Sequence, residues 1–452
     1  MSVVVTKSPS VLVGPATAPA AVSPPSTEHI IKLTSFDKAL AFLPVKSFHV
    51  FTHAIHEPAE TVRHALSLAL VHYFPVAGRL VVVDGGGGGG DLRIACTGEG
   101  VAFVAASANR SLDDVSLLDP PFAPALLNEL AVGLGADDGL FRPSDPLLLV
   151  QVTEFACGGF VVGVTRNHAV ADGTGFAQLM QAVGELARGV PRPSVLPVSC
   201  GDDDLPPLPP SVFAMEKKLL TLEQKDFAYL DITVPSACIS RIKAGYFAGD
   251  DGDGPCTVFE AVMAVLWQSR TRAVISDTAA PAPLVFAANV RKLVGAKKGY
   301  YGNCITSAVI VPTSGEVANG SIQDVVGLIK RAKRPIPLQF RKKKKNDDDV
   351  VAGEEEEEED EESPGFGDEV MFGYNVLDVT SWRNLGADAV DFGGGRPARV
   401  MCVMDRLAVP NCVACLPYCA GKKDDGANVL ARCVREEHVD AFLAEIAKLT
   451  AM

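Results

Sequence analysis

The stretch Asn167-His168-Ala169-Val170-Ala171-Asp172-Gly173 places a histidine and an aspartate four residues apart, between two segments of predicted secondary structure. Residues 159–164 are short, β-branched and bounded by glycine, which predicts a buried strand. From Thr174 onward apolar residues recur at helical spacing until Gly189. His168 is therefore expected on a strand-to-helix loop, where an imidazole can take up and return a proton near neutral pH.

An incidental His-x-x-x-Asp pair is the alternative explanation, because the chain contains 8 histidines and 55 acidic residues. The composition limits the class of protein in other ways. A length of 452 residues with 48% hydrophobic residues predicts a folded chain of two or three domains. A net charge of −14 argues against a nucleic-acid partner. No stretch is apolar enough to span a bilayer and no secretory or transit signal is recognisable, so a cytoplasmic location is expected.

Two clusters resemble metal sites, but neither has a complete set of ligands. The first comprises Cys412, Cys415 and Cys419, which follow one another in an apolar, strand-like segment. Without a fourth ligand nearby, these are better interpreted as buried thiols. The second comprises His49, His53 and His56, which lack the glutamate of a metalloprotease helix. They are interpreted as structural or surface histidines, and no metal is expected.

Composition also divides the chain into regions. Residues 1–28 are expected to be a flexible lead, and a Pro-rich, acidic crossover linker at 189–222 separates an N-terminal domain, 29–188, from a C-terminal domain, 223–452. The Lys-, Asp- and Glu-rich block 342–363 is expected to be a disordered insertion.

Local patterns add secondary structure to these regions. An amphipathic helix is predicted over residues 61–80, and Thr257-Val258-Phe259-Glu260 is a capping box that begins another. Strands and helices alternate without regular βαβ repetition, which predicts two α/β domains with mixed sheets.

Taken together, these motifs resemble the BAHD family of plant acyl-CoA-dependent acyltransferases over the chain from Ile30 onward. The family's two signatures correspond to His168-Ala169-Val170-Ala171-Asp172-Gly173 and Asp391-Phe392-Gly393-Gly394-Gly395, the second departing from the family because Gly394 replaces a tryptophan. Further matches are Tyr73-Phe74-Pro75-Val76-Ala77-Gly78-Arg79-Leu80, Tyr301-Gly302-Asn303-Cys304 and Thr380-Ser381-Trp382. The resemblance implies two similar domains with mixed β-sheets and flanking helices, a chloramphenicol-acetyltransferase-like fold and a channel at the domain interface.

The resemblance also implies roles for individual residues. His168 would be the general base of a direct transfer without an acyl-enzyme. Asp172 would organise the loop by pairing with Arg291 of Asn289-Val290-Arg291, where Asn289 replaces the usual acid. A side chain at Gly173 would crowd the channel.

Other family positions are implied with alternatives left open. Asp391 would be structural, or part of a plain glycine turn. Thr380 and Trp382 would line the channel near the acyl group and the acceptor, or be a strand residue and a core aromatic. Lys243 would lie near the CoA phosphates, or be an ordinary surface lysine.

Acyl-CoA is the implied co-substrate of a monomer with no permanently bound cofactor and no membrane partner. Relatives that acylate shikimate or quinate hold the acceptor carboxylate with an arginine shortly before the Thr-Ser-Trp segment. Residues 365–379 contain no Lys or Arg, so the resemblance implies that carboxylated acceptors are poor. Aromatic donors (benzoyl, hydroxycinnamoyl) are expected, with an alcohol or amine of plant specialised metabolism as acceptor. Two alternatives stay open: a condensation-type enzyme that uses a carrier-bound thioester, although Asn167 replaces its usual first histidine, and a non-catalytic binding or regulatory relative.

Overall fold

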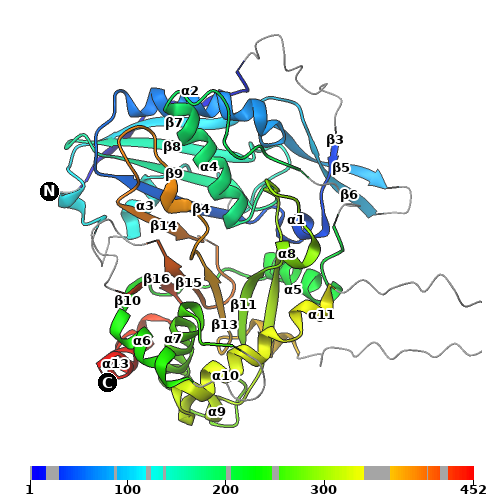
Figure 1. Cartoon of the computed structure of the whole chain (residues 1–452), viewed down its shortest axis with the longest axis vertical. Coiled ribbons are helices and arrows are strands. Elements are labelled where there is room, and N and C mark those ends of the chain that lie inside the picture. The colour runs from blue at the N-terminus through cyan, green and yellow to red at the C-terminus, as the bar shows by residue number, and fades with distance from the viewer. Residues whose placement is uncertain are drawn as a thin grey trace, which may run out of the picture.

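The computed structural model describes residues 3–16, 30–85, 89–118, 124–135, 139–199, 205–246, 254–340, 367–404, 406–417 and 426–451. Their strands form three sheets, and the two larger sheets belong to two halves that lie one above the other (Figure 1). Each half is a mixed sheet with flanking helices, as the sequence predicts.

The sheet of the upper half has the strand order β1-β7-β8-β9-β4-β14, with β2 also paired to β7. Its strands are β1 Val5–Lys7, β2 Val11–Val13, β4 Pro44–Phe51, β7 Val101–Ala108, β8 Leu148–Phe155, β9 Phe160–Asn167 and β14 Arg399–Val403. Every residue of β9 is buried, which is typical of a central strand covered on both faces. Helices α2 (Pro58–His72) and α4 (Gly173–Ala187) pack against each other in this half.

Strand β14 comes from the second half of the chain and pairs antiparallel with β4. The core of the upper half accordingly includes Trp382, Phe392 and Val400 from the C-terminal segment. The two halves are therefore joined by shared sheet and shared core as well as by the connecting chain.

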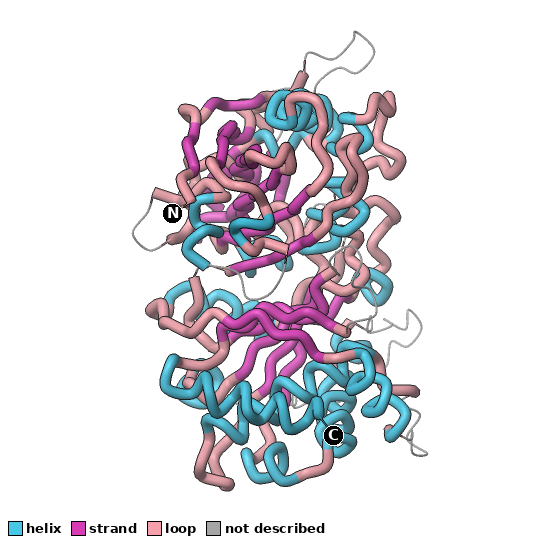
Figure 2. The backbone as a smooth tube through the Cα atoms, turned by 90° about the vertical axis from the view of Figure 1, so that its left-hand side faces the viewer, coloured by secondary structure: helices cyan, strands magenta, loops and turns pink. Residues whose placement is uncertain are grey.

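The second large sheet has the order β10-β16-β15-β13-β11-β12, and a small third sheet has the order β3-β6-β5. Their bounds are β10 Leu230–Val234, β11 Leu284–Asn289, β12 Ile305–Ile310, β13 Leu377–Ser381, β15 Asn411–Leu416, β16 Ala427–Arg432, β3 Ile30–Lys32, β5 Arg79–Gly85 and β6 Gly89–Ala95. Figure 2 shows helices under one face of the second sheet, while its other face is turned toward the upper half.

The remaining helices are α1 Ser35–Leu40, α3 Pro124–Glu129, α5 Pro210–Thr221, α6 Ser236–Gly245, α7 Val258–Val274, α8 Arg291–Val294, α9 Ser314–Asn319, α10 Ile322–Lys333, α11 Ile336–Gln339, α12 Asp368–Phe372 and α13 Val439–Ala451. Short 3₁₀ helices span Phe74–Ala77, Asp113–Val115, Ala387–Ala389 and Glu436–His438. Capping boxes begin α1, α7, α9 and α10, which fixes where these helices start.

Several local predictions are confirmed: the strand over 159–164 is β9, the helix after Thr174 is α4, and the Thr257 capping box begins α7. The helix predicted over 61–80 is wrong at both ends. It starts at Pro58, a favourable first helical residue, and stops at His72 because Pro75 lies in a 3₁₀ turn and Arg79 begins β5.

Two regional predictions need correction. Residues 3–16 are not a flexible lead, because β1 and β2 pair with β7 and extend the edge of the upper sheet. The expected linker at 189–222 contains α5, which packs against α1. The domain bounds otherwise stay a prediction, and the charged block 342–363 lies outside the described residues.

Candidate active site

A pocket lies between the two halves and is lined by residues from both. The upper half contributes His168 and Leu43, and α5 contributes Glu216. Asp378 and Thr380, two residues apart on β13, line the wall formed by the second sheet because alternate side chains of a strand share a face. The pocket brings two of the predicted residues together, His168 and Thr380.

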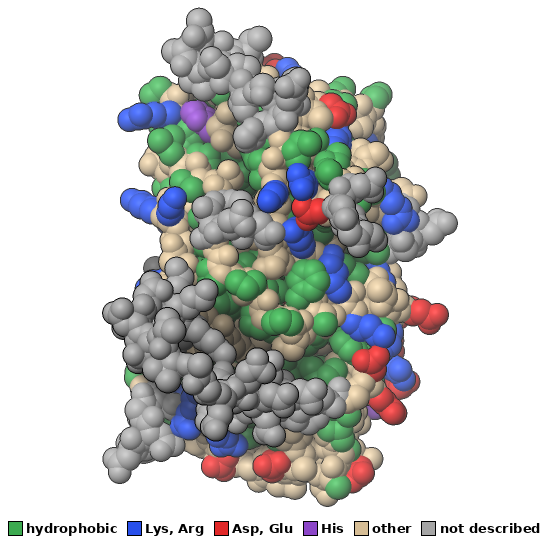
Figure 3. Space-filling model, turned by 90° about the vertical axis from the view of Figure 1, so that its right-hand side faces the viewer, with side chains coloured by type: hydrophobic (Ala, Val, Ile, Leu, Met, Phe, Trp, Pro, Cys, Tyr) green, Lys and Arg blue, Asp and Glu red, His purple; other side chains and the backbone are tan. Residues whose placement is uncertain are grey.

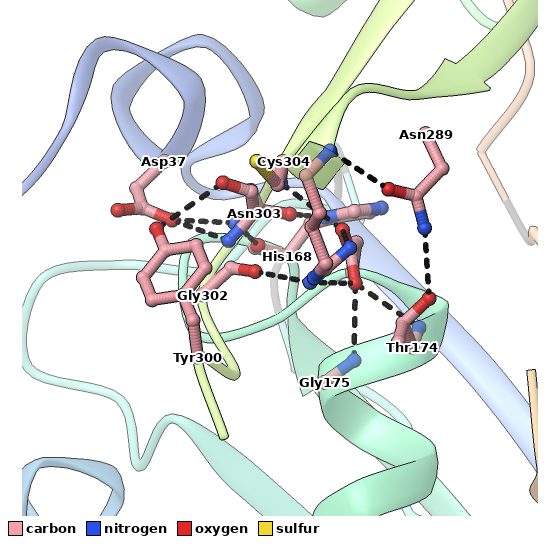
Figure 4. A network of polar contacts seen from close by, with 11 residues as sticks. Asp37, His168, Thr174, Gly175, Asn289, Tyr300, Gly302, Asn303 and Cys304 are labelled. Atoms are coloured by element: carbon pink, nitrogen blue, oxygen red, sulfur yellow. Dashed lines mark hydrogen bonds and ion pairs between the residues drawn. The ribbon is translucent and has the colours of Figure 1, made fainter. Parts of the chain in front are cut away.

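His168 follows β9 directly and lies on the loop before α4. Its backbone nitrogen donates to the carbonyl of Leu43 at 2.9 Å, and its carbonyl accepts from Nδ2 of Asn303 at 2.7 Å. Its side chain is partly exposed to the pocket and Nδ1 lies 2.9 Å from Oδ1 of Asn303 (Figure 4). The position of the imidazole is thus fixed by hydrogen bonds to the His168 backbone and by one hydrogen bond to Nδ1.

The orientation of the Asn303 amide determines which ring nitrogen of His168 carries the hydrogen. Nδ2 of Asn303 donates to Oδ1 of Asp37 at 2.8 Å and to the His168 carbonyl, and both of these groups are acceptors. The amide oxygen therefore faces Nδ1, and because an amide oxygen only accepts, Nδ1 must be the donor. Nε2 is left with its lone pair, which is the form that a general base requires.

Asp37 anchors this arrangement at the start of α1. Its side chain accepts from Thr34 in the capping box and from both the backbone nitrogen and the amide of Asn303. Burial raises the pKa of Asp37, against the hydrogen bonds from Asn303 and Thr34 that lower it. Neither Asp37 nor a role for Asn303 was predicted from the sequence. Thr34-Ser35-Phe36-Asp37 nevertheless has the pattern of a capping box, and Asn303 lies in a matched motif.

Asp172 is the N-cap of α4 and joins three segments of the chain: the start of α4, Arg291 of α8 and the loop of residues 302–304. Oδ1 accepts from the backbone nitrogens of Thr174 and Gly175, both at 3.0 Å. Oδ2 accepts from the backbone nitrogen of Cys304 at 3.0 Å. Arg291 pairs with both oxygens, and its guanidinium also donates to the carbonyl of Gly302 at 2.7 Å. The Asp172–Arg291 pair expected from the resemblance is present, and Asp172 points into this network.

Asn289, which replaces the family's acid, keeps a local role. Its Oδ1 accepts from the backbone nitrogen of Arg291 at 3.0 Å, and its Nδ2 lies 3.4 Å from Oγ1 of Thr174 (Figure 4). An amide satisfies both contacts without charge, and among the described residues Asp172 is the one acidic side chain that pairs with Arg291.

Burial and nearby positive charge set the protonation state of His168. Burial lowers the pKa of His168 to about 4, and the neighbouring Arg166 guanidinium contributes in the same direction. The Arg166 side chain is buried above the Phe176 ring, with 4.3 Å from its guanidinium carbon to the ring centroid. The imidazole is consequently neutral at physiological pH.

Asp391 shapes the glycine loop of the second signature. Its Oδ1 accepts from the backbone nitrogens of Gly393 and Gly395 at 2.7 and 3.0 Å, and Arg188 at the end of α4 donates to its carbonyl. A Cβ at Gly394 would lie 2.8 Å from Cγ2 of Ile55, so Ile55 occupies the space where an indole would begin. Asp391 therefore acts within its own loop and against α4, outside the pocket lining.

Three other predicted residues do not line the pocket. A Cβ at Gly173 would lie 2.6 Å from the Leu385 side chain, which belongs to a loop and does not line the pocket. A side chain at position 173 would therefore clash with this loop and not with the channel. Trp382 is 5% exposed in the core of the upper half, which corresponds to the core-aromatic interpretation. Lys243 is exposed on α6, which packs against α7.

The metal interpretations receive no support from the part of the chain that the structure describes. Cys412 and Cys415 are buried in β15, and His49 is buried in β4. Among the described residues no group of three His, Cys, Asp or Glu side chains has the geometry of a metal site. The helices in these ranges are also too short or too polar to cross a bilayer.

Glu216 and Asp378 are ionisable pocket residues that sequence reasoning missed. Glu216 falls in the segment interpreted as linker. Asp378 lies two positions before the matched Thr380-Ser381-Trp382, separated from it by Val379. No spacing rule joins residues 162 positions apart, and only the approach of α5 to β13 brings both to one cavity.

Comparison with known proteins adds independent information. The profile of a family described as Transferase family matches residues 17–448. The chain is 44% identical to Acyl transferase 15 of Oryza sativa subsp. japonica over 464 residues, with 100% of both chains covered. It is 32% identical to Myricetin 3-O-glucosyl 1,2-rhamnoside 6'-O-caffeoyltransferase AT2 of Crocosmia x crocosmiiflora over 457 residues, covering 96% of this chain and 98% of the relative.

Solved structures support the fold. Vinorine synthase superposes with a TM-score of 0.68 at 18% identity, covering 99% of this chain and 98% of that chain. TRI101 of F. graminearum, complexed with coenzyme A and T-2 mycotoxin, superposes with a TM-score of 0.62 at 16% identity, covering 92% and 97%. The two-domain architecture with mixed sheets is therefore shared over nearly the whole chain.

Proposed function

The chain belongs to the BAHD transferase family of plant acyl-CoA-dependent acyltransferases, and from this premise we propose that it transfers an aromatic acyl group from CoA to a small metabolite with His168 as the general base. The observation that carries the proposal is the neutral imidazole at the pocket between the halves, with Nδ1 held by Asn303 and Nε2 free to accept a proton.

We propose that the acyl group passes directly from CoA to the acceptor within the pocket. Nε2 of His168 takes the proton from the acceptor hydroxyl or amine while its oxygen or nitrogen attacks the thioester carbonyl carbon. The tetrahedral intermediate collapses, the carbon–sulfur bond breaks, and His168 returns the proton to the CoA sulfur. Because the pocket holds both reactants beside one base, no acyl-enzyme is required.

Asp172 and Arg291 position the loop that carries His168. Thr380 is proposed to contact substrate because it lines the same pocket. Benzoyl and hydroxycinnamoyl donors are proposed because members of the family commonly use them. A caffeoyltransferase among the relatives supports an aromatic acyl group.

The polyanionic end of CoA needs local positive charge on a chain whose net charge is −14. Figure 3 shows Lys and Arg side chains over the middle of the face toward which α5 and α8 lie in Figure 1. Lys292, Lys297 and Lys298 are exposed on and just after α8, beside the Arg291–Asp172 pair. We assign the CoA phosphates to this basic segment in preference to Lys243.

The condensation-type alternative has no support from Asn167, which occupies the place of its first histidine. Oδ1 of Asn167 accepts from the backbone nitrogens of Phe42 and Ala169, both at 3.0 Å, and the side chain is buried. The Asn167 side chain therefore stabilises the loop that carries His168.

The test is a thiol-release assay with a panel of acyl-CoAs against pooled alcohols and amines, using wild type and His168→Ala. We expect release by wild type and a loss on the order of 10²- to 10⁴-fold in the variant. Near-full activity of His168→Ala contradicts the general-base role, and no release by wild type with any pair favours the non-catalytic alternative.

A further inference from the structure

Two carboxyl groups line the same pocket as His168, and the proposed reaction does not use either of them. Glu216 reaches the pocket from α5, and Ser307 on β12 donates to its Oε1 at 2.8 Å. Asp378 reaches it from β13, and Asn411 on β15 donates to its Oδ2 at 2.8 Å. Each side chain is oriented by a neutral donor from a neighbouring strand.

No cation of the described chain neutralises this pair. Arg406 is the only Lys or Arg that lines the pocket within the described residues. Its guanidinium donates to the carbonyls of Leu219 and Leu220 at 3.1 Å each, and also to that of Leu222, so it is engaged at the C-terminal end of α5. No ion pair of Glu216 or Asp378 is found among the described residues. Both residues are half-buried at the pocket wall, where a carboxylate without a counter-charge costs free energy.

The rest of the lining is mostly apolar and includes Leu40, Leu43 and Leu219. A cavity with aliphatic walls and two acidic groups is complementary to a methylene chain that ends in a cation. It is poorly suited to a carboxylated acceptor, as the absence of basic residues from 365–379 also predicts.

Resting on the proposed acyl transfer, we infer that the acceptor is an aliphatic diamine or polyamine, whose one ammonium group pairs with Glu216 and Asp378 while a second amine reaches His168. The reacting amine enters as the free base after releasing one proton to water. Its nitrogen forms the bond to the acyl carbon, its N–H proton passes to Nε2 of His168, and the carbon–sulfur bond breaks. His168 then returns the proton to CoA, which leaves as the thiol, and the product is an amide.

The ionisation of the two groups is compatible with this role. Burial, together with the negative charge of Asp378, raises the pKa of Glu216 to about 7. Burial raises the pKa of Asp378 to about 6. A bound ammonium group would stabilise the ionised forms, since an opposite charge within a few Å favours them.

The experiment compares three acceptors of equal chain length: 1,4-diaminobutane, 1,4-butanediol and 4-aminobutanoate, each with the acyl-CoA that gives the fastest thiol release. We expect kcat/KM to be highest for the diamine and lowest for the amino acid, which carries a like charge. Glu216→Gln and Asp378→Asn should each raise KM for the diamine on the order of 10- to 100-fold, the loss of one charge-assisted contact. Glu223→Gln, an exposed neighbour of α5, is the matched control and should behave as wild type.

The outcomes separate this inference from the proposed function. A diol used as well as the diamine overturns the inference alone, as do folded Glu216 and Asp378 variants whose KM for the diamine equals that of Glu223→Gln. Calorimetric titration of 1,4-diaminobutane into each variant gives a second measure of binding that does not require turnover. Absence of CoA release by wild type with every alcohol and amine tested overturns the proposed function itself.

Discussion

Arg291 contacts both carboxylate oxygens of Asp172, with Nη1–Oδ2 at 2.7 Å and Nη2–Oδ1 at 2.8 Å, although 119 positions separate the two residues. The pair joins the start of α4 to α8 across the two halves and is largely buried, with Asp172 2% exposed. The loop that carries His168 is therefore held by residues of the second half of the chain.

Arg291→Lys is expected to lower both kcat and the melting temperature. A lysine keeps the charge but cannot form two parallel hydrogen bonds with a carboxylate and also reach the Gly302 carbonyl. Arg291→Ala is expected to cost about 3–5 kcal/mol of unfolding free energy, because it leaves a buried charge unpaired. Thermal denaturation and the thiol-release assay measure the two effects.

Asp172→Asn serves as the partner variant in this prediction. It should shift stability and rate in the same direction, and the double variant should show less than the sum of the two losses because the residues share one contact. Additive losses, or no change in rate and melting temperature, would remove the pair from the scheme.

The second prediction concerns the hydrogen on His168. Asn303→Leu removes the acceptor at Nδ1, so the ring can adopt the other tautomer, with Nε2 protonated and unable to act as a base. We expect kcat to fall about 10- to 100-fold with a smaller change in KM. Nitrogen NMR of the labelled imidazole should show hydrogen on Nδ1 in wild type and a mixture in the variant.

Asn303→Gln is the conservative comparison, because it retains the amide and should restore part of kcat if its oxygen reaches Nδ1. Wild-type imidazole protonated at Nε2 would be incompatible with this mechanism, whatever the kinetics of the variants.

Local patterns in the sequence predicted the segments that form this site. The strand before His168 and the helix after Asp172 follow from hydrophobic periodicity, and both are present as β9 and α4. Periodicity failed near Tyr73-Phe74-Pro75, since an amphipathic pattern continues through a proline that cannot continue the helix.

The two carboxyl groups of the pocket could not be predicted from the sequence, for a physical reason. Glu216 and Asp378 meet only because a helix in the predicted linker approaches a strand of the second sheet. The motif left Trp382 either in the channel or in the core, and its burial depends on how the C-terminal segment packs into the upper half. Such contacts depend on long-range packing, which composition and local spacing do not encode.

The third prediction assigns Asp391 to stability. Asp391→Ala removes an oxygen that accepts two backbone hydrogen bonds within the glycine loop. We expect a loss of about 1–3 kcal/mol in unfolding free energy, with kcat and KM close to wild type well below the melting temperature. A large fall in kcat without a fall in stability would instead place Asp391 in the chemistry.

The fourth prediction is a displaced pH profile. With the pKa of His168 lowered to about 4 by burial, the base stays neutral far below the ordinary value of 6.5. With 1,4-butanediol as the acceptor, which carries no charge to pair with Glu216 and Asp378, kcat/KM should therefore be flat between pH 8 and 5.5 and fall only as pH approaches 4. Circular dichroism at each pH separates this from acid unfolding. A limb centred near pH 6.5 would contradict the burial argument.

The fifth prediction tests the acidic pair through stability, without substrate. The pKa of Glu216 is raised by burial and by Asp378 from 4.5 to about 7, so the folded state retains a proton that the unfolded chain releases. Stability is then lost as pH rises from about 4.5 through 7, and Glu216→Gln removes that loss while its amide oxygen still accepts from Ser307. The unfolding free energy of the variant should match that of wild type near pH 4.5 and exceed it by at most ~3 kcal/mol at pH 8.

Chemical denaturation across this pH range, with Glu223→Gln as the exposed control, measures the difference in unfolding free energy. A variant that is less stable than wild type at pH 8 would show that the carboxylate is already compensated by the protein, and the pocket would then have no need of a cationic ligand.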